Sequence, residues 1–190
     1  SKYNQPVEPV DAASLSCISR MIAIKTAELL GDTAQTAKLS DAITRTRDSV
    51  NSLMWNKTGR VYNDLTQTGH QQLGVKTPVS FYPLLAEIPT SEQKADLVAV
   101  LTDPAKFWLH YIVPTNAQDE DGFSATAYWR GPVWYRTNWL VVRSLITAGK
   151  YQIAKDIINK TLALTTLTPE SYCREVFDPV TGSPADGMGV

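Results

Sequence analysis

The sequence contains few of the side chains that form disulfides or bind metals, with two cysteines and two histidines among 190 residues. Cys17 and Cys173 lie far apart along the chain, which argues against a disulfide framework and favours two unpaired thiols. His70 and His110 lack metal-ligand spacing, and the acidic run at residues 119–121 lacks the loop pattern of a calcium site. We therefore expect no metal or cofactor, and we expect the acidic run to be a solvated loop.

An excess of charge of one sign is also lacking. The chain has 18 basic and 19 acidic side chains, and its formal net charge is -1. This balance argues against nucleic acids and anionic membranes as partners, because both attract basic surfaces. No apolar run approaches the roughly 20 residues of a membrane span, and the polar residues 1–6 lack the apolar centre of a signal peptide. A neutral polar ligand fits the composition best, and the compartment stays open.

Helical periodicity is abundant. Apolar residues recur every three or four positions through most of the chain, and no strand-rich region occurs. Gly31 and Gly149 predict helix ends, because glycine adopts the left-handed conformation without a steric penalty. Ser91 is the expected N-cap of a helix that begins there, and the chain as a whole is predicted to be all-α. The six predicted helices cover residues 11–30, 33–55, 79–86, 91–101, 134–148 and 151–164.

The connections predict how these helices pair. Tight links at Gly31 and Gly149 join successive helices into antiparallel hairpins, and three such hairpins would form half of a six-hairpin toroid. The irregular stretches at about 102–124 and 165–190 are long, and loops of this kind commonly hold binding groups on a rigid scaffold. A tight turn is expected at residues 57–60, followed by a short extended segment.

Residues 128–139, Tyr-Trp-Arg-Gly-Pro-Val-Trp-Tyr-Arg-Thr-Asn-Trp, form the most distinctive segment. Tryptophan rings stack on the C–H-rich faces of sugars, and arginine and asparagine form paired hydrogen bonds with sugar hydroxyls. The alternative is that these tryptophans only pack between neighbouring helices. We expect Trp139 in the helical wall and Trp129 and Trp134 near a ligand, with Pro132 in the first turn of the helix that follows.

A second segment, residues 174–182, places Glu175 in a loop before a turn that contains proline and glycine. A carboxylate held in this way can point into a cavity and activate a water molecule, as an inverting glycosidase requires. Taken alone, a glutamate beside Arg174 is more typical of a surface ion pair. Asp178 precedes Pro179 and is expected to form the turn rather than to take part in chemistry.

Taken together, these segments resemble family 63 glycoside hydrolases, which act on mannosyl- or glucosylglycerate and on oligosaccharides. Trehalases share the fold more distantly. The resemblance covers nearly the whole chain, and the Tyr-Trp-Arg-Gly-Pro-Val-Trp stretch at residues 128–134 is its most specific part. The other similar segments are residues 7–11, 53–64, 81–84 and 175–182.

The resemblance implies an (α/α)6 barrel, an inverting mechanism and a carbohydrate substrate, either an α-glucoside or an α-mannoside. It also implies that Glu175 is the catalytic general base. The sugar-binding residues expected on this basis are Tyr128, Trp129, Arg130, Gly131, Trp134 and Asn138.

In such enzymes the general acid is an aspartate upstream of the segment matched by residues 7–11, and a helix follows the loop matched by residues 175–182. We therefore expect residues 1–190 to form one partial catalytic domain without the N-terminal hairpins, the acid and the closing helix. Its exposed apolar flank would be covered by the missing part of the barrel, as a second segment or chain, or by self-association. The alternatives are a non-catalytic carbohydrate-binding or scaffold fragment of the same fold, and a helical-hairpin interaction protein.

Overall fold

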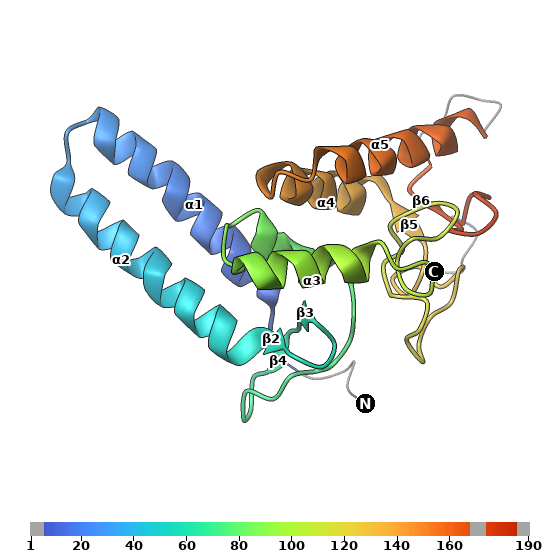
Figure 1. Ribbon diagram of the computed structural model, residues 1–190, viewed down its shortest axis with the longest axis horizontal. Coiled ribbons are helices and arrows are strands. Elements are labelled where there is room, and N and C mark those ends of the chain that lie inside the picture. Colours follow the sequence, from blue (N-terminus) through green and yellow to red (C-terminus); the bar gives the residue numbers. More distant parts are fainter. Residues whose placement is uncertain (1–5, 168–173, 186–190) are drawn as a thin grey trace.

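The computed structural model describes residues 6–167 and 174–185, and all six segments predicted as helical are helices (Figure 1). The prediction of an all-α chain is confirmed, because the strands of the described ranges are only two residues long. The helices are α1 (Val10–Leu29), α2 (Thr33–Ser49), the π-helix η1 (Val50–Met54), the 3-10 helix η2 (Pro78–Leu84), α3 (Ser91–Leu101), α4 (Tyr135–Thr147) and α5 (Tyr151–Thr166). The strands are β1 (Val7–Glu8), β2 (Trp55–Asn56), β3 (Val61–Tyr62), β4 (Leu65–Thr66), β5 (Val133–Trp134) and β6 (Val176–Phe177).

Two of the predicted helices differ from regular α-helices. The second predicted helix continues from α2 into η1 and ends at Met54, because Trp55 begins β2. η2 begins at Pro78 and contains Pro83, which has no N–H to donate to an α-helical hydrogen bond. A tight 3-10 helix therefore stands where a regular helix was expected.

The N-cap of α3 is Thr90, so the prediction of Ser91 is wrong by one residue. The Thr90 hydroxyl accepts a hydrogen bond from the Gln93 N–H at 3.2 Å. In return, Gln93 Oε1 accepts a hydrogen bond from the Thr90 N–H at 2.8 Å. This reciprocal arrangement is a capping box, which satisfies two amides that the helix itself leaves without partners.

Two hairpins of helices are clear in the structure, α1 against α2 and α4 against α5 (Figure 1). Gly31 and Gly149 both have a φ of 72°, the left-handed conformation predicted for these helix ends. The middle pair differs, because η2 packs against α1 and α4 whereas α3 contacts β3. α1, η2 and α4 are therefore neighbours in space although long stretches of chain separate them. This arrangement agrees with part of an (α/α)6 toroid.

The first hairpin exposes a stripe of apolar side chains. Leu15, Ile22 and Leu29 recur every two turns on one face of α1, and their exposed fractions are 45%, 61% and 88%. The same helix buries Ser14 and Cys17. This stripe agrees with the apolar flank predicted for a partial barrel. None of the described helices is long and apolar enough to cross a membrane.

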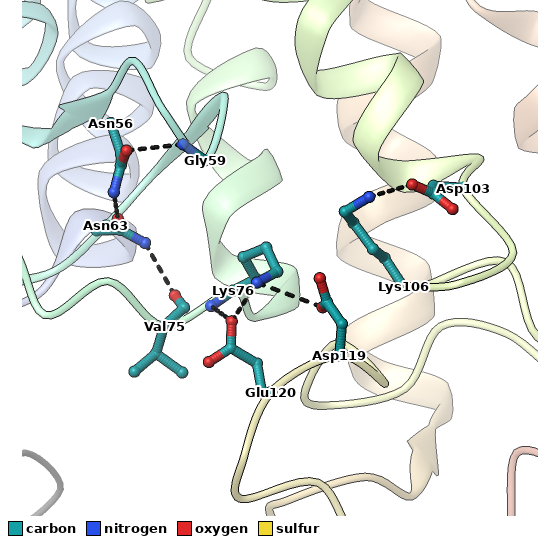
Figure 2. Close-up of polar contacts among 9 residues, drawn as sticks. All are labelled: Asn56, Gly59, Asn63, Val75, Lys76, Asp103, Lys106, Asp119 and Glu120. Atoms are coloured by element: carbon teal, nitrogen blue, oxygen red, sulfur yellow. Dashed lines mark hydrogen bonds and ion pairs between the residues drawn. The ribbon is translucent and has the colours of Figure 1, made fainter.

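The acidic run at residues 119–121 takes part in an internal ion pair (Figure 2). The Lys76 ammonium lies 2.5 Å from Glu120 Oε1 and 3.3 Å from Asp119 Oδ1, and Glu120 is buried. The Lys76 backbone N–H also donates to Glu120, at 3.1 Å. The prediction of a solvated loop is therefore wrong for Glu120. Its carboxylate is tolerated inside the protein because an ammonium neutralises it.

Short strands hold the connections in register. β2 and β3 form a hairpin across residues 57–60, where a turn was predicted, and β1 pairs with β4. β5 pairs with β6, which places Val133 opposite Phe177 and Trp134 opposite Val176. The last pair joins the aromatic segment to the loop of the predicted base.

Candidate functional site

The pairing of β5 with β6 brings together the two segments that the sequence singled out. Glu175 directly precedes β6, so the pairing of Val176 with Trp134 places Glu175 beside Trp134 and Tyr135 of the aromatic segment. A hollow of about 520 Å³ lies at this junction. The residues that line it are Tyr128, Trp129, Trp134, Tyr135, Arg136, Arg174 and Glu175.

Glu175 is exposed to this hollow and is hydrogen-bonded by the Tyr128 hydroxyl. Partial desolvation raises the pKa of Tyr128, and the hydrogen bond to Glu175 and the negative charge of Glu175 raise it further. The phenol therefore stays protonated and able to donate. Among the described residues that line the hollow, Glu175 is the single carboxylate.

A tight turn after β6 fixes the position of this loop. Asp178 Oδ1 accepts hydrogen bonds from the backbone N–H groups of Val180 at 2.7 Å and Thr181 at 3.0 Å. Gly182 has a φ of 72°, and a Cβ at this position would lie 2.5–2.8 Å from the side chains of Leu167 and Tyr111. The prediction that Asp178 forms the turn is confirmed, and the turn holds Glu175 on the rim of the hollow.

The tryptophans of the site stack on each other. The Trp129 and Trp134 ring centroids are 4.0 Å apart with an interplanar angle of 9°, and Tyr128 meets Trp134 edge-on at 4.7 Å. The Trp134 Nε1–H donates to the Tyr128 carbonyl at 3.0 Å. Trp134 is 7% exposed whereas Trp129 is 52% exposed. Trp129 is therefore the ring that offers contact surface to a ligand, and the buried Trp134 ring stacks against it.

The two arginines of the aromatic segment face different hollows. Arg136, in the first turn of α4, lines the hollow of Glu175. Arg130, which was predicted to bind sugar, is exposed and lines a neighbouring hollow. Arg130 was predicted because it lies within the family-like stretch at residues 128–134, whereas Arg136 lies just beyond it.

The structure does not bring Asn138 or Gly131 to the surface of the site. The Asn138 amide is buried, accepts from the Val113 N–H at 2.7 Å and donates to the Ile112 carbonyl at 2.6 Å and to Thr161 Oγ1 at 2.8 Å. Gly131 is required for packing, because a Cβ there would lie 2.1 Å from the Ser124 carbonyl oxygen. Both residues therefore build the scaffold behind the site, and we leave them out of the proposed sugar contacts.

Trp139 and the cysteines lie away from the base. Trp139 projects from α4, is 61% exposed and lines an adjoining hollow rather than a packed wall. Cys17 is an unpaired, buried thiol, and burial raises its pKa. Cys173 lies outside the described residues. Among the residues that are described, no group of three or more His, Cys, Asp or Glu side chains could hold a metal ion.

The adjoining hollow, of about 640 Å³, is lined by two acidic residues that were not predicted as site residues. Asp11 and Asp64 line it together with Trp129 and Arg136, which also line the hollow of Glu175. Asp64 Oδ1 accepts a hydrogen bond from the Val10 N–H at 2.8 Å, at the start of α1. Burial raises the pKa of Asp64, and this hydrogen bond opposes the shift. Asp64 ends the family-like segment at residues 53–64 but was not predicted as a site residue, because its position beside Val10 depends on the packing of α1.

Comparison with known proteins places the chain in a family. Residues 4–189 match the mannosylglycerate hydrolase MGH1-like glycoside hydrolase domain. The chain belongs to this family. The mannosylglycerate hydrolase of Thermus thermophilus is 30% identical over 139 residues, which cover 72% of this chain and 32% of that protein. The mannosylglycerate hydrolase of Rubrobacter radiotolerans is 26% identical over 179 residues, covering 93% of this chain and 39% of that protein.

Solved structures agree with this assignment. A family 63 mannosylglycerate hydrolase of Thermus thermophilus, solved in complex with Tris, is 25% identical and matches with a TM-score of 0.81, covering 94% of this chain and 41% of that one. The neutral trehalase of Saccharomyces cerevisiae matches with a TM-score of 0.79 at 14% identity, over 90% of this chain and 34% of that one, which shows a shared fold. The predicted resemblance to family 63 and the toroid fold are confirmed. The chain spans about a third to two-fifths of the length of the curated relatives it matches.

Proposed function

We propose that this chain carries the general-base side of an inverting glycoside hydrolase, with Glu175 as the base. The observation that carries the proposal is the position of Glu175, a single carboxylate in a hollow lined by Trp129, Tyr128 and Arg136. Aromatic rings bind the C–H faces of a sugar, and guanidinium groups bind its hydroxyls. Sugar and base thus meet in one hollow.

In this mechanism the ionised Glu175 accepts a proton from a water molecule as that water attacks the anomeric carbon. The glycosidic bond breaks on the opposite face, and the departing oxygen takes a proton from an acid. Tyr128 donates a hydrogen bond to Glu175 and so fixes the direction in which the carboxylate points. The expected product is a free sugar with inverted anomeric configuration.

The acid is proposed to come from the part of the longer relatives that this chain does not span. An inverting pair needs two carboxyl groups roughly 6.5–9.5 Å apart, and the described lining of the Glu175 hollow supplies one. The relatives named above are mannosylglycerate hydrolases, so we propose an α-mannoside or α-glucoside as substrate, with mannosylglycerate as the first to test. The chain by itself is expected to hydrolyse it very slowly.

Proton NMR of the first-formed product tests this proposal. The complete enzyme, with both carboxylates, should release the β-anomer from an α-glycoside before mutarotation mixes the anomers. First release of the α-anomer would mean retention and would overturn the assignment of Glu175 as a base.

The single carboxylate of the hollow also fits a second candidate function, a carbohydrate-binding module of the same fold. Calorimetry with methyl α-D-mannopyranoside separates the two candidates. Binding that is tight and unchanged in Glu175→Ala, in a protein without hydrolytic activity, would favour the binding module. Turnover that depends on Glu175 would favour the hydrolase.

A further inference from the structure

One stretch of chain, residues 109–115, contacts both segments that line the hollow of Glu175, and we call it the linking segment. The Tyr111 N–H donates to the Pro179 carbonyl at 2.8 Å, in the turn that follows β6. A Cβ added at Gly182 would lie 2.6–2.8 Å from the Tyr111 ring, so the ring packs directly against this turn. The linking segment therefore holds the loop of the base.

The other end of the linking segment contacts the aromatic segment. The Thr115 N–H donates to the Pro132 carbonyl at 3.1 Å, and Thr115 Oγ1 accepts a hydrogen bond from the Gly131 N–H at 3.0 Å. Pro114 forms an isolated bridge with Val133, the first residue of β5. Since β5 and β6 are each only two residues long, their own pairing forms few hydrogen bonds, and the linking segment adds contacts to both sides.

Lys160, in α5, binds the start of the linking segment. Its ammonium donates to the Leu109 carbonyl at 2.9 Å and to the His110 carbonyl at 2.7 Å, and it lies 6.0 Å from the centroid of the Trp108 ring. Burial lowers the pKa of this ammonium, and the negative charge of Asp156 opposes the shift. A partly desolvated cation on two consecutive carbonyls fixes the backbone there, because hydrogen bonds from a charged donor are strong.

The helices hold the linking segment at alternate positions to the site. Next to Lys160, Thr161 accepts a hydrogen bond from Asn138, whose amide also bonds the Ile112 carbonyl and the Val113 N–H. The helical side chains therefore bind residues 109, 110, 112 and 113, while residues 111 and 115 bind the base loop and the aromatic segment. Lys160 differs from the buried Asn138 in being partly exposed, so it can be replaced without leaving a hole in the core.

We propose that Lys160 is a positioning residue of the hydrolase, which sets where Glu175 lies relative to Tyr128 by holding the linking segment. Lys160 is not one of the described residues that line the hollow of Glu175, so it acts through the backbone of residues 109–111 and the loop of the base. A base must be placed accurately, because a displacement of about 1 Å can cost on the order of 100-fold in rate. The proposal rests on the proposed function, since it takes Glu175 as the base.

The Tyr128 phenol reports this geometry in the chain at neutral pH, because its hydroxyl donates to Glu175. The NMR chemical shift of its Cζ should move in Lys160→Met towards the value in Glu175→Ala, where the acceptor is absent. Lys160→Arg should keep the wild-type shift, since a guanidinium can donate to both carbonyls. Lys155→Met replaces an exposed lysine of the same helix, and this matched control should also keep the wild-type shift.

Kinetics of the complete enzyme give the second readout. Lys160→Met should lower kcat at least about tenfold with little change in KM, because the base moves while the proposed sugar contacts stay in place. Lys160→Arg should restore most of the activity. A lower thermal midpoint with unchanged kcat and an unchanged Tyr128 shift would make Lys160 merely structural and would overturn the proposal. If Lys160→Met fails to fold, Lys160→Gln takes its place, since the amide keeps a donor but reaches one carbonyl, and an unchanged Tyr128 shift there would equally overturn it.

The Tyr128 shift does not depend on hydrolysis, so the two proposals can fail separately. Turnover that survives Glu175→Gln would refute the assigned base, whereas a response of the shift to Lys160→Met would still show that Lys160 places this carboxylate. Loss of turnover in Glu175→Gln together with an unchanged shift in Lys160→Met would refute the positioning role alone.

Discussion

Two loop regions of the molecule carry a glutamate beside other charged residues, and they differ in what surrounds the carboxylate. Glu120 is buried and ion-paired with Lys76, and it ties together segments 44 positions apart. Glu175 is exposed to a hollow of aromatic rings, where a phenol is its hydrogen-bond donor. The first region should therefore determine stability and the second should determine activity. Substitutions in each region test this difference between stability and activity.

The largest effect on stability is expected at the buried ion pair of Lys76 and Glu120. Lys76→Met leaves a buried carboxylate without its partner, which should cost about 3–5 kcal/mol in the free energy of unfolding. Urea denaturation measures it. The double substitution Lys76→Met with Glu120→Leu is the control and should recover most of the loss. A loss below about 1 kcal/mol for Lys76→Met would mean that the pair is not buried in solution.

Alkaline unfolding should report the buried phenol of Tyr82 next to the site. Burial raises its pKa to about 12, so the folded state holds this proton after the unfolded state has lost it. The contribution is complete below about pH 10 and is lost as pH rises towards 12, by roughly 2–3 kcal/mol in total. Tyr82→Phe should move the alkaline transition to higher pH. An unchanged transition would show that Tyr82 is accessible to water in the folded protein.

Tyr128→Phe should act on turnover rather than on stability. The substitution removes the hydrogen bond that orients the Glu175 carboxylate, so kcat should fall at least about tenfold. The thermal midpoint should change little, because Tyr128 is an exposed residue. A matching loss of stability with unchanged kcat would place Tyr128 in the scaffold instead.

The smallest effect concerns the apolar stripe of α1. Sedimentation or light scattering should show concentration-dependent association of the chain, because Leu15, Ile22 and Leu29 are exposed together. Ile22→Lys should weaken this association about tenfold. Thr44→Lys adds the same charge on α2 and should have no effect. A chain that stays monomeric at every concentration would contradict an incomplete barrel.

The helices were predictable because their signals are local. Apolar periodicity, Gly31 and Gly149 lie within the segments that they control. Even the error at Ser91 was local, since Thr90 and Gln93 show the spacing of a capping box. Apolar periodicity did not show which face of α1 is buried, because Leu15, Ile22 and Leu29 are exposed whereas Ser14 and Cys17 are buried.

The candidate site was predictable only in part. Its two segments lie far apart along the chain, where Val133 pairs with Phe177, and only a family resemblance brought them together. Asn138 fits sugar chemistry by residue type, but Ile112 and Thr161 from other parts of the chain use its amide.

Turnover of Glu175→Gln in the complete enzyme tests whether Glu175 is the general base. Glutamine keeps the shape of the side chain and cannot accept the proton of the attacking water, so kcat for mannosylglycerate should fall by about 10²–10⁴-fold with little change in thermal midpoint. Glu92→Gln, an exposed glutamate in the first turn of α3, is the control and should keep full activity. A Glu175→Gln enzyme that retains wild-type turnover would contradict the account.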